Sequence, residues 1–149
     1  MKKIIGIIFL IVLVCLFVIP FTSWTLPKPV TLSVATDNTK IPVKYGLYCG
    51  DAFLTNKCDT IEKVDISTLE AVEVSPNSTV KFNFEEKPDE LQIIREDKEG
   101  NEKDRKSYLD DDKNNIIIPN KAGIHYYSIE AKWDDKSRSA YYYFSIKVI

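Results

Sequence analysis

Few side chains in this chain of 149 residues could do chemistry. Histidine is the side chain best suited to general acid–base catalysis near neutral pH, and the sequence holds one, His125. It falls on the apolar face of an alternating segment, where a lone histidine is more often a hydrogen-bonded core residue. No serine or carboxylate can be assigned to it as a partner in a nucleophilic triad. We therefore predict no catalytic residue and no enzymatic activity.

Acidic residues offer one partial metal-binding pattern. Asp110, Asp112 and Asn114 occupy the first, third and fifth positions of a calcium-binding loop. Asn115 stands where that loop needs glycine, and Lys121 stands where it needs a bidentate glutamate. The calcium motif therefore fails, and we expect a solvated loop and no metal site.

No cofactor is expected either. A phosphate-binding loop needs closely spaced glycines, and the glycines of this chain beyond residue 40 form no such series: Gly46, Gly50, Gly100 and Gly123. A carboxylate pair of the glycosidase type needs two acids facing one cleft, and no predicted strand places two acids together on a concave face.

Cysteine spacing predicts one disulfide. Cys49 and Cys58 are too far apart for a redox-active C-x-x-C pair. A zinc site would need two further ligands, and the sequence supplies only one histidine. In an oxidising compartment a structural disulfide between Cys49 and Cys58 is the natural expectation.

Exposed tyrosines are the best lead to a binding surface. Tyr126 on one predicted strand and Tyr141 and Tyr143 on the next share the outer face of a C-terminal hairpin. Tyrosines clustered on a sheet surface suit contact with carbohydrate or protein. The alternative is that another strand or a charged loop covers this face, or that the rings only pack across strands.

The N-terminus predicts a membrane anchor. Lys2 and Lys3 precede 18 uncharged residues, Ile4 to Phe21, which as a helix would extend about 27 Å and just cross a bilayer. Basic residues before the span favour a cytoplasmic N-terminus and an extracellular C-terminal domain. We expect an anchor at residues 1–22, an extended stalk at 23–29 and one extracytoplasmic domain at 30–149.

Two alternatives to this anchor remain open. The leader could be a cleaved secretory signal, although its apolar run is long and no A-x-A-like site follows it. Cys15 could be lipidated, although Val14 stands where a lipoprotein signal has a small residue. Otherwise Cys15 serves as a small hydrophobic residue within the helix.

Charge argues against nucleic acid as a partner. The chain carries 22 acidic and 20 basic residues, and two of the basic ones, Lys2 and Lys3, precede the apolar run. The remaining domain is therefore acidic and has no basic stripe. The expected partners are the membrane, through residues 4–21, and an envelope protein or carbohydrate.

Alternating hydrophobic residues separated by turn signals predict an all-β domain, an antiparallel sandwich of seven to nine short strands. Gly50 to Thr60 is expected to be a loop, Ile66 to Ala71 a short helical turn capped by Asp65 or Ser67, and Asp97 to Asp112 a surface hairpin or loop. The expected strands cover residues 30–35, 41–49, 72–74, 80–84, 91–94, 116–118, 123–133 and 140–148. Ile116 to Ile118 are expected in the core. In the last strand Ser145 is expected to face outward, and the expected inner face is Ala140, Tyr142, Phe144, Ile146 and Val148.

The C-terminal pattern resembles the end of immunoglobulin-like extracellular modules in membrane-anchored or secreted proteins of Gram-positive bacteria. The residues that carry this resemblance are Pro119, Gly123, His125, Tyr127, Ile129, Ala131, Trp133, Ser139, Tyr142 and Phe144. The segment Ile41 to Cys49, Cys58 and the turn at Pro76 are also similar. His125 departs from this group, which has tyrosine there, and so does Gly50, where a bulky aromatic is expected. The resemblance implies fold and location and no activity.

These observations predict a single-pass membrane protein with an extracytoplasmic immunoglobulin-like sandwich, acting as a binding or structural module of the cell envelope. Two other classes stay open. One is an envelope enzyme, cleaved or anchored, whose carboxylates meet only in the fold. The other is a sensor or regulatory subunit of a membrane complex whose helix contacts partners.

Overall fold

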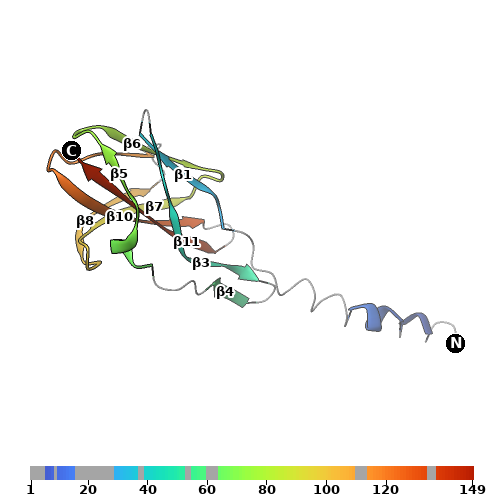
Figure 1. The fold of residues 1–149 in the computed structure, drawn as a ribbon. Helices are drawn as coiled ribbons and strands as arrows, with labels where there is room; N and C mark the ends of the chain where they lie inside the picture. The colour runs from blue at the N-terminus through green and yellow to red at the C-terminus, as the bar shows by residue number, and fades with distance from the viewer. Residues whose placement is uncertain are drawn as a thin grey trace.

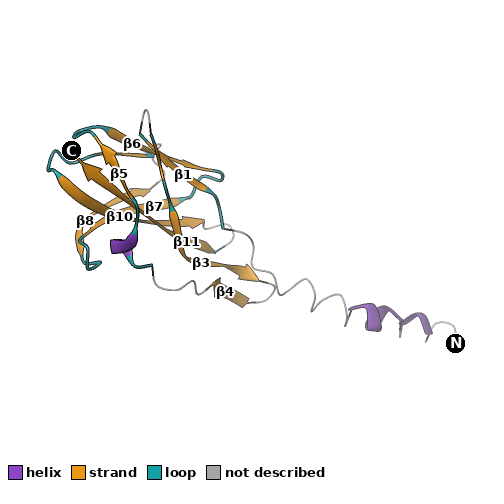
Figure 2. Cartoon of the chain, in the orientation of Figure 1, coloured by secondary structure: helices purple, strands orange, loops and turns teal. Residues whose placement is uncertain are grey.

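The computed structural model describes residues 6–8, 10–15, 29–36, 39–52, 55–59, 64–109, 114–133 and 137–149. Strands dominate these ranges, and one short 3-10 helix, η1 (Ile66–Thr68), lies among them (Figure 2). The strands are β1 (Leu32–Ala35), β2 (Lys40–Ile41), β3 (Lys44–Ala52), β4 (Thr55–Asp59), β5 (Ala71–Val74), β6 (Thr79–Phe84), β7 (Glu90–Glu96), β8 (Glu102–Leu109), β9 (Asn115–Ile117), β10 (Gly123–Trp133) and β11 (Arg138–Val148).

The strands form two sheets of unequal width (Figure 1). The small sheet has four strands in the order β2-β1-β6-β9, and the large sheet has the order β4-β3-β11-β10-β7-β8 with β5 beside β11. Every pairing is antiparallel except that of β5 with β11. The expected all-β, largely antiparallel fold is confirmed.

One hydrophobic core joins the two sheets. Phe82 of the small sheet lies 6.0 Å from Phe144 of the large sheet, and Phe84 lies 6.3 Å from Trp133, measured between ring centroids. The buried Tyr142 hydroxyl donates a 2.9 Å hydrogen bond to the carbonyl of Val30. The inner face predicted for the last strand is confirmed, because its five residues are all buried: Ala140, Tyr142, Phe144, Ile146 and Val148.

In the middle of the chain, the predicted capping of a short helical turn by Asp65 is also confirmed. Asp65 caps η1, because its carboxylate accepts hydrogen bonds from the backbone and the hydroxyl of Ser67. These bonds lower the pKa of the Asp65 carboxyl. The expected surface hairpin or loop after Asp97 instead supplies a turn and then β8, which pairs with β7 in the large sheet. In that turn the Asp97 carboxylate accepts a 2.8 Å hydrogen bond from the backbone N–H of Asn101.

Three details of the sequence interpretation were wrong. The segment expected to be a loop from Gly50 continues β3 and returns as β4, because paired backbone groups extend the hairpin as far as Ala52 and Thr55. Ile117 is exposed although Ile116 and Ile118 are buried, since β9 faces the core on one side only. Ser145, expected outside, is fully buried because η1 and the residues after it lie over it, and its hydroxyl donates to the carbonyl of Leu69.

The disulfide between Cys49 and Cys58 is present and joins β3 to β4. In the N-terminal segment, residues 6–8 and 10–15 are helical. Among the described residues no helix has the length and apolar character to cross a membrane. The expected anchor therefore stays a prediction.

Candidate functional site

The three predicted surface tyrosines do share the outer face of the large sheet. Tyr126 pairs with Ser145 in register, Tyr143 with Ser128, and Tyr141 with Glu130. All three are only half-buried. The prediction that these three tyrosines share one face of the C-terminal hairpin is therefore correct.

Two of these tyrosines already have partners within the chain. The Tyr143 ring lies over Gly46, where an added Cβ atom would come 2.4 Å from its Cε2 atom. The Tyr141 hydroxyl donates to Glu130, and burial followed by this hydrogen bond raises the pKa of Tyr141 to about 12. Tyr141 and Tyr143 thus contact residues of neighbouring strands, which is the alternative to a binding surface that the sequence left open.

A shallow groove borders the tyrosine face. It has a volume of about 450 Å³ and runs between the segment Val64–Ile66 and the β7–β8 turn, with Tyr143 at its edge. Glu96 lines it and accepts a hydrogen bond from Ser128. Lys98 and Glu99 in the turn pair with each other across 3.5 Å. The charges of this groove thus have partners within the chain.

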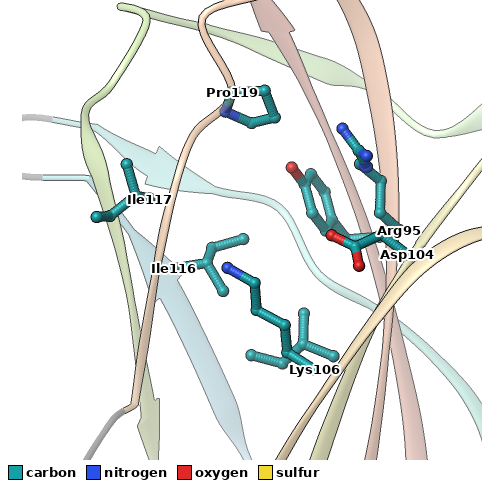
Figure 3. Close-up of a pocket in the computed structure, with 8 residues that line it drawn as sticks. Arg95, Asp104, Lys106, Ile116, Ile117 and Pro119 are labelled. Carbon is teal, nitrogen blue, oxygen red and sulfur yellow. The ribbon is translucent and has the colours of Figure 1, made fainter.

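A second cleft lies between the two sheets. The small sheet ends at β9, whereas the large sheet continues through β7 to β8. A space of about 130 Å³ opens where β9 faces these two strands (Figure 3). We call it the intersheet cleft, and its lining residues are Ile93, Arg95, Asp104, Lys106, Ile116, Ile117, Pro119 and Tyr127.

Charged side chains enter this cleft from the large sheet. Arg95 pairs in register with Asp104, and Ile93 pairs with Lys106, so all four lie on the face that elsewhere forms the apolar core. Figure 3 shows Arg95, Asp104 and Lys106 on one side of the space and Ile116, Ile117 and Pro119 on the other. Charges on the inner face of a sheet cost free energy unless they are paired or solvated. Asp104 and Lys106 are exposed to water at the rim of the cleft, whereas Arg95 is half-buried.

Arg95 has an unmet hydrogen-bonding need. Its Nε atom is buried and has no hydrogen-bond partner among the described residues. A buried donor without an acceptor costs about 1–3 kcal/mol, and such groups are rare in native proteins. Burial also raises the pKa of neighbouring Tyr127 to about 12, an effect that the Arg95 charge partly offsets. The cleft can therefore accept a ligand that brings a hydrogen-bond acceptor and negative charge.

Sequence reasoning missed this cleft for a clear reason. Arg95 directly follows the apolar Ile93 and Ile94, and Asp104 and Lys106 belong to a segment whose high charge predicts a surface hairpin or loop. Pairing of β7 with β8 brings the three charges together, and the unequal widths of the two sheets leave them facing an open cleft. The alternation of Asp104 and Lys106 on one face of β8 was the available signal.

An ion pair between a buried arginine and a partly exposed glutamate lies elsewhere in the domain. Arg138, with 7% of its side chain exposed, bonds to both carboxylate oxygens of Glu86 and stacks on Trp133, 5.3 Å from the ring centroid. The indole of Trp133 in turn donates to the carbonyl of Glu86. This arrangement ties the β6–β7 connection to β11, which is a structural role.

The remaining candidates from the sequence are placed as follows. His125 is half-buried, and its Nε2 atom lies 2.8 Å from the carbonyl oxygen of Lys121. Asp110 and Asp112 lie outside the described residues. Within the described part of the chain, no group of three or more histidine, cysteine, aspartate or glutamate residues could hold a metal ion.

Comparison with known proteins does not indicate a site, so the choice of a candidate site depends on the geometry of the structure. No family model, curated protein or solved structure matches this chain. Of the surfaces described, the intersheet cleft combines an apolar lining, three charged side chains and a buried donor that has no acceptor in the described part of the chain. We therefore take it as the candidate ligand-binding site.

Proposed function

We propose that this chain is a single-pass protein of the cell envelope whose extracytoplasmic, immunoglobulin-like sandwich is a binding module, and that the intersheet cleft holds its ligand. The observation that carries the proposal is the buried Nε of Arg95, which has no acceptor among the described residues, in a cleft that also contains Lys106. Natural ligand sites combine an apolar lining with a few placed polar groups in this way.

Location outside the cytoplasm rests on the leader and on the disulfide. Residues 4–21 are long enough to anchor the chain, and Lys2 and Lys3 favour a cytoplasmic N-terminus. The disulfide between Cys49 and Cys58 suits an oxidising compartment. The resemblance to extracellular modules of Gram-positive bacteria supports the same side of the membrane.

An affinity isolation tests the proposed function. The full-length chain, tagged at its C-terminus and solubilised in mild detergent, is mixed with envelope material, and bound molecules are compared with those held by Arg95→Gln. Arg105→Gln is the matched control, because Arg105 lies on the opposite face of the same hairpin and bonds to Gln92 and Glu102. We expect Arg95→Gln to reduce capture about tenfold or more, as loss of a charged hydrogen bond does.

Two results would count against this function. Equal capture by the wild-type chain, Arg95→Gln and Arg105→Gln would show that the intersheet cleft does not hold the ligand. A reporter fused after Ile149 that is active only in the cytosol would contradict the extracytoplasmic placement. Cleavage after the leader would instead support the secreted alternative and leave the binding module intact.

A further inference from the structure

The open edge of the small sheet lies beside the intersheet cleft. β9 pairs with β6 on one side, and no described strand pairs with its other side. The carbonyl of Asn114 and the N–H of Ile118 bond to β6 and its N-terminal flank. Because hydrogen-bonding direction alternates along an antiparallel strand, Asn115 and Ile117 direct their N–H and C=O groups toward the open side.

Short length is the one protection that β9 itself gives this edge. Natural proteins block open edges with very short strands, charged side chains, proline or bulges, because an unpaired edge is a template for another strand. β9 consists of Asn115, Ile116 and Ile117, has no charge, and leaves the Ile117 side chain 65% exposed. Pro119 stands beyond the strand and leaves the outward groups of Asn115 and Ile117 in place.

The open edge and the charged cleft belong to one surface. A strand added beside β9 would extend the small sheet over the part of the large sheet formed by β7 and β8. Its residue next to Ile116 would share the inward direction of that buried side chain and meet Arg95 and Lys106. Its neighbours would point outward beside exposed Ile117, since side chains alternate along a strand.

We propose that the ligand of the intersheet cleft is an extended segment of another protein, which adds to β9 as a further strand and places an acidic side chain between the sheets. This rests on the proposed binding function and names its partner. Strand addition at a sheet edge is a recurring mode of peptide recognition, in which backbone bonds supply affinity and side-chain pockets supply specificity.

Charge decides which segment fits. Arg95 and Lys106 outnumber Asp104 in the cleft, so a carboxylate is favoured and would supply the acceptor that the Arg95 Nε lacks. A second copy of this chain fits less well, because antiparallel pairing of two β9 strands around Ile116 would bring a second isoleucine into the charged cleft. The favoured pattern is therefore apolar, acidic, apolar.

Peptide binding tests the proposal. The probe is the fluorescently labelled peptide acetyl-Thr-Val-Glu-Val-Thr-amide, and the reference is the same peptide with lysine in place of glutamate. Fluorescence anisotropy is measured with the full-length chain in mild detergent. We expect the acidic peptide to bind at least about tenfold more tightly than the basic one.

Two variants separate the backbone and charge requirements. Ile117→Pro removes an N–H that points to the open side, so it should abolish binding of the acidic peptide. Since this variant could unfold, the double variant Arg95→Glu, Lys106→Glu provides a second test and should prefer the basic peptide. Ile124→Lys is the control, because Ile124 is also exposed, at 52%, but lies on β10 of the other sheet.

The outcomes are distinct. Equal binding of the two peptides, or wild-type binding by a folded Ile117→Pro variant, overturns strand addition. Equal affinity for N-acetylglutamate amide alone would assign the cleft to a free small anion, and self-association that depends on Ile117 would assign the edge to a second copy. Either would overturn the proposed partner. If Arg95→Gln still lost its envelope ligand in these cases, the binding function would stand.

Discussion

Cys49 and Cys58 stand directly opposite each other in the β3–β4 pair, and their disulfide fastens the outermost strand of the large sheet. β4 pairs only with β3 among the described strands, so few other contacts hold it in place. An edge strand with one neighbour would otherwise open easily.

The paired substitution Cys49→Ser, Cys58→Ser should therefore loosen β4 more than the core. We expect amide exchange of β4 to quicken while β10 and β11 stay protected. The free energy of unfolding should fall by at most about 2–3 kcal/mol, the value expected for a loop of this length in the chain-entropy model. Hydrogen exchange with mass spectrometry makes the comparison. Equal loss of protection in β4 and β11 would contradict a local role for the disulfide.

The ion pair of Arg138 with Glu86 should be costly to break. Arg138 is almost fully buried, whereas 43% of the Glu86 side chain is exposed, so water screens part of the interaction. We expect Glu86→Ala to lower the free energy of unfolding by about 1–3 kcal/mol.

Glu73→Ala is the matched control for this prediction. Glu73 pairs with Lys147 at 2.8 Å, and both side chains are about half exposed. Surface pairs contribute about 0–1 kcal/mol, so this variant should be nearly neutral in urea denaturation. Equal effects of Glu73→Ala and Glu86→Ala would show that burial of Arg138 adds nothing.

Gly46 makes room for the Tyr143 ring. A Cβ atom at position 46 would lie 2.4 Å from that ring and 3.3 Å from the Cβ of Tyr141. Gly46→Ala should therefore displace the ring and destabilise the domain by about 1–3 kcal/mol, as overpacking does. In the background of Tyr143→Ala the same substitution should cost much less, and thermal unfolding of the four proteins measures this coupling. Additive effects of the two substitutions would mean that the ring is not what Gly46 accommodates.

Buried tyrosines should titrate late. Burial raises the pKa of Tyr127 to about 12, from an ordinary value of 10.0. Because the folded state keeps the proton more tightly, Tyr127 contributes stability below pH 10 that is lost as the pH rises through about 12. Absorbance at alkaline pH should show a late phase of tyrosine ionisation that Tyr127→Phe diminishes. An unchanged late phase in that variant would refute the assignment of this residue.

Much of the fold could be predicted because apolar and polar side chains alternate regularly along its strands. The inner faces of β10 and β11 follow from the alternation of apolar and polar residues. The Asp65 cap follows from the residue types at a helix end, and the disulfide follows from the spacing of two cysteines. The β3–β4 hairpin could not be predicted, because Gly50 and Asp51 are weak strand formers and only pairing with β4 extends them.

The candidate site was beyond sequence reasoning for a different reason. Tyr126, Tyr141 and Tyr143 were correctly placed on one face, but the partners of Tyr143 and Tyr141 are Gly46 and Glu130, which come from strands other than β11. Arg95 and Lys106 lie together because β7 pairs with β8, but they line a cleft because the small sheet stops at β9 while the large sheet continues. Sheet width is a tertiary property that no local window of sequence contains.

Photo-crosslinking in intact cells tests the central claim most directly. A photoreactive amino acid replaces Ile117 at the edge of the cleft in the full-length chain, and in a parallel chain it replaces Ile124. The account predicts a specific adduct with an envelope molecule from position 117, lost when Arg95→Gln is added, and none from position 124. No adduct from position 117, or the same adducts from both positions, would contradict a binding module that uses this cleft.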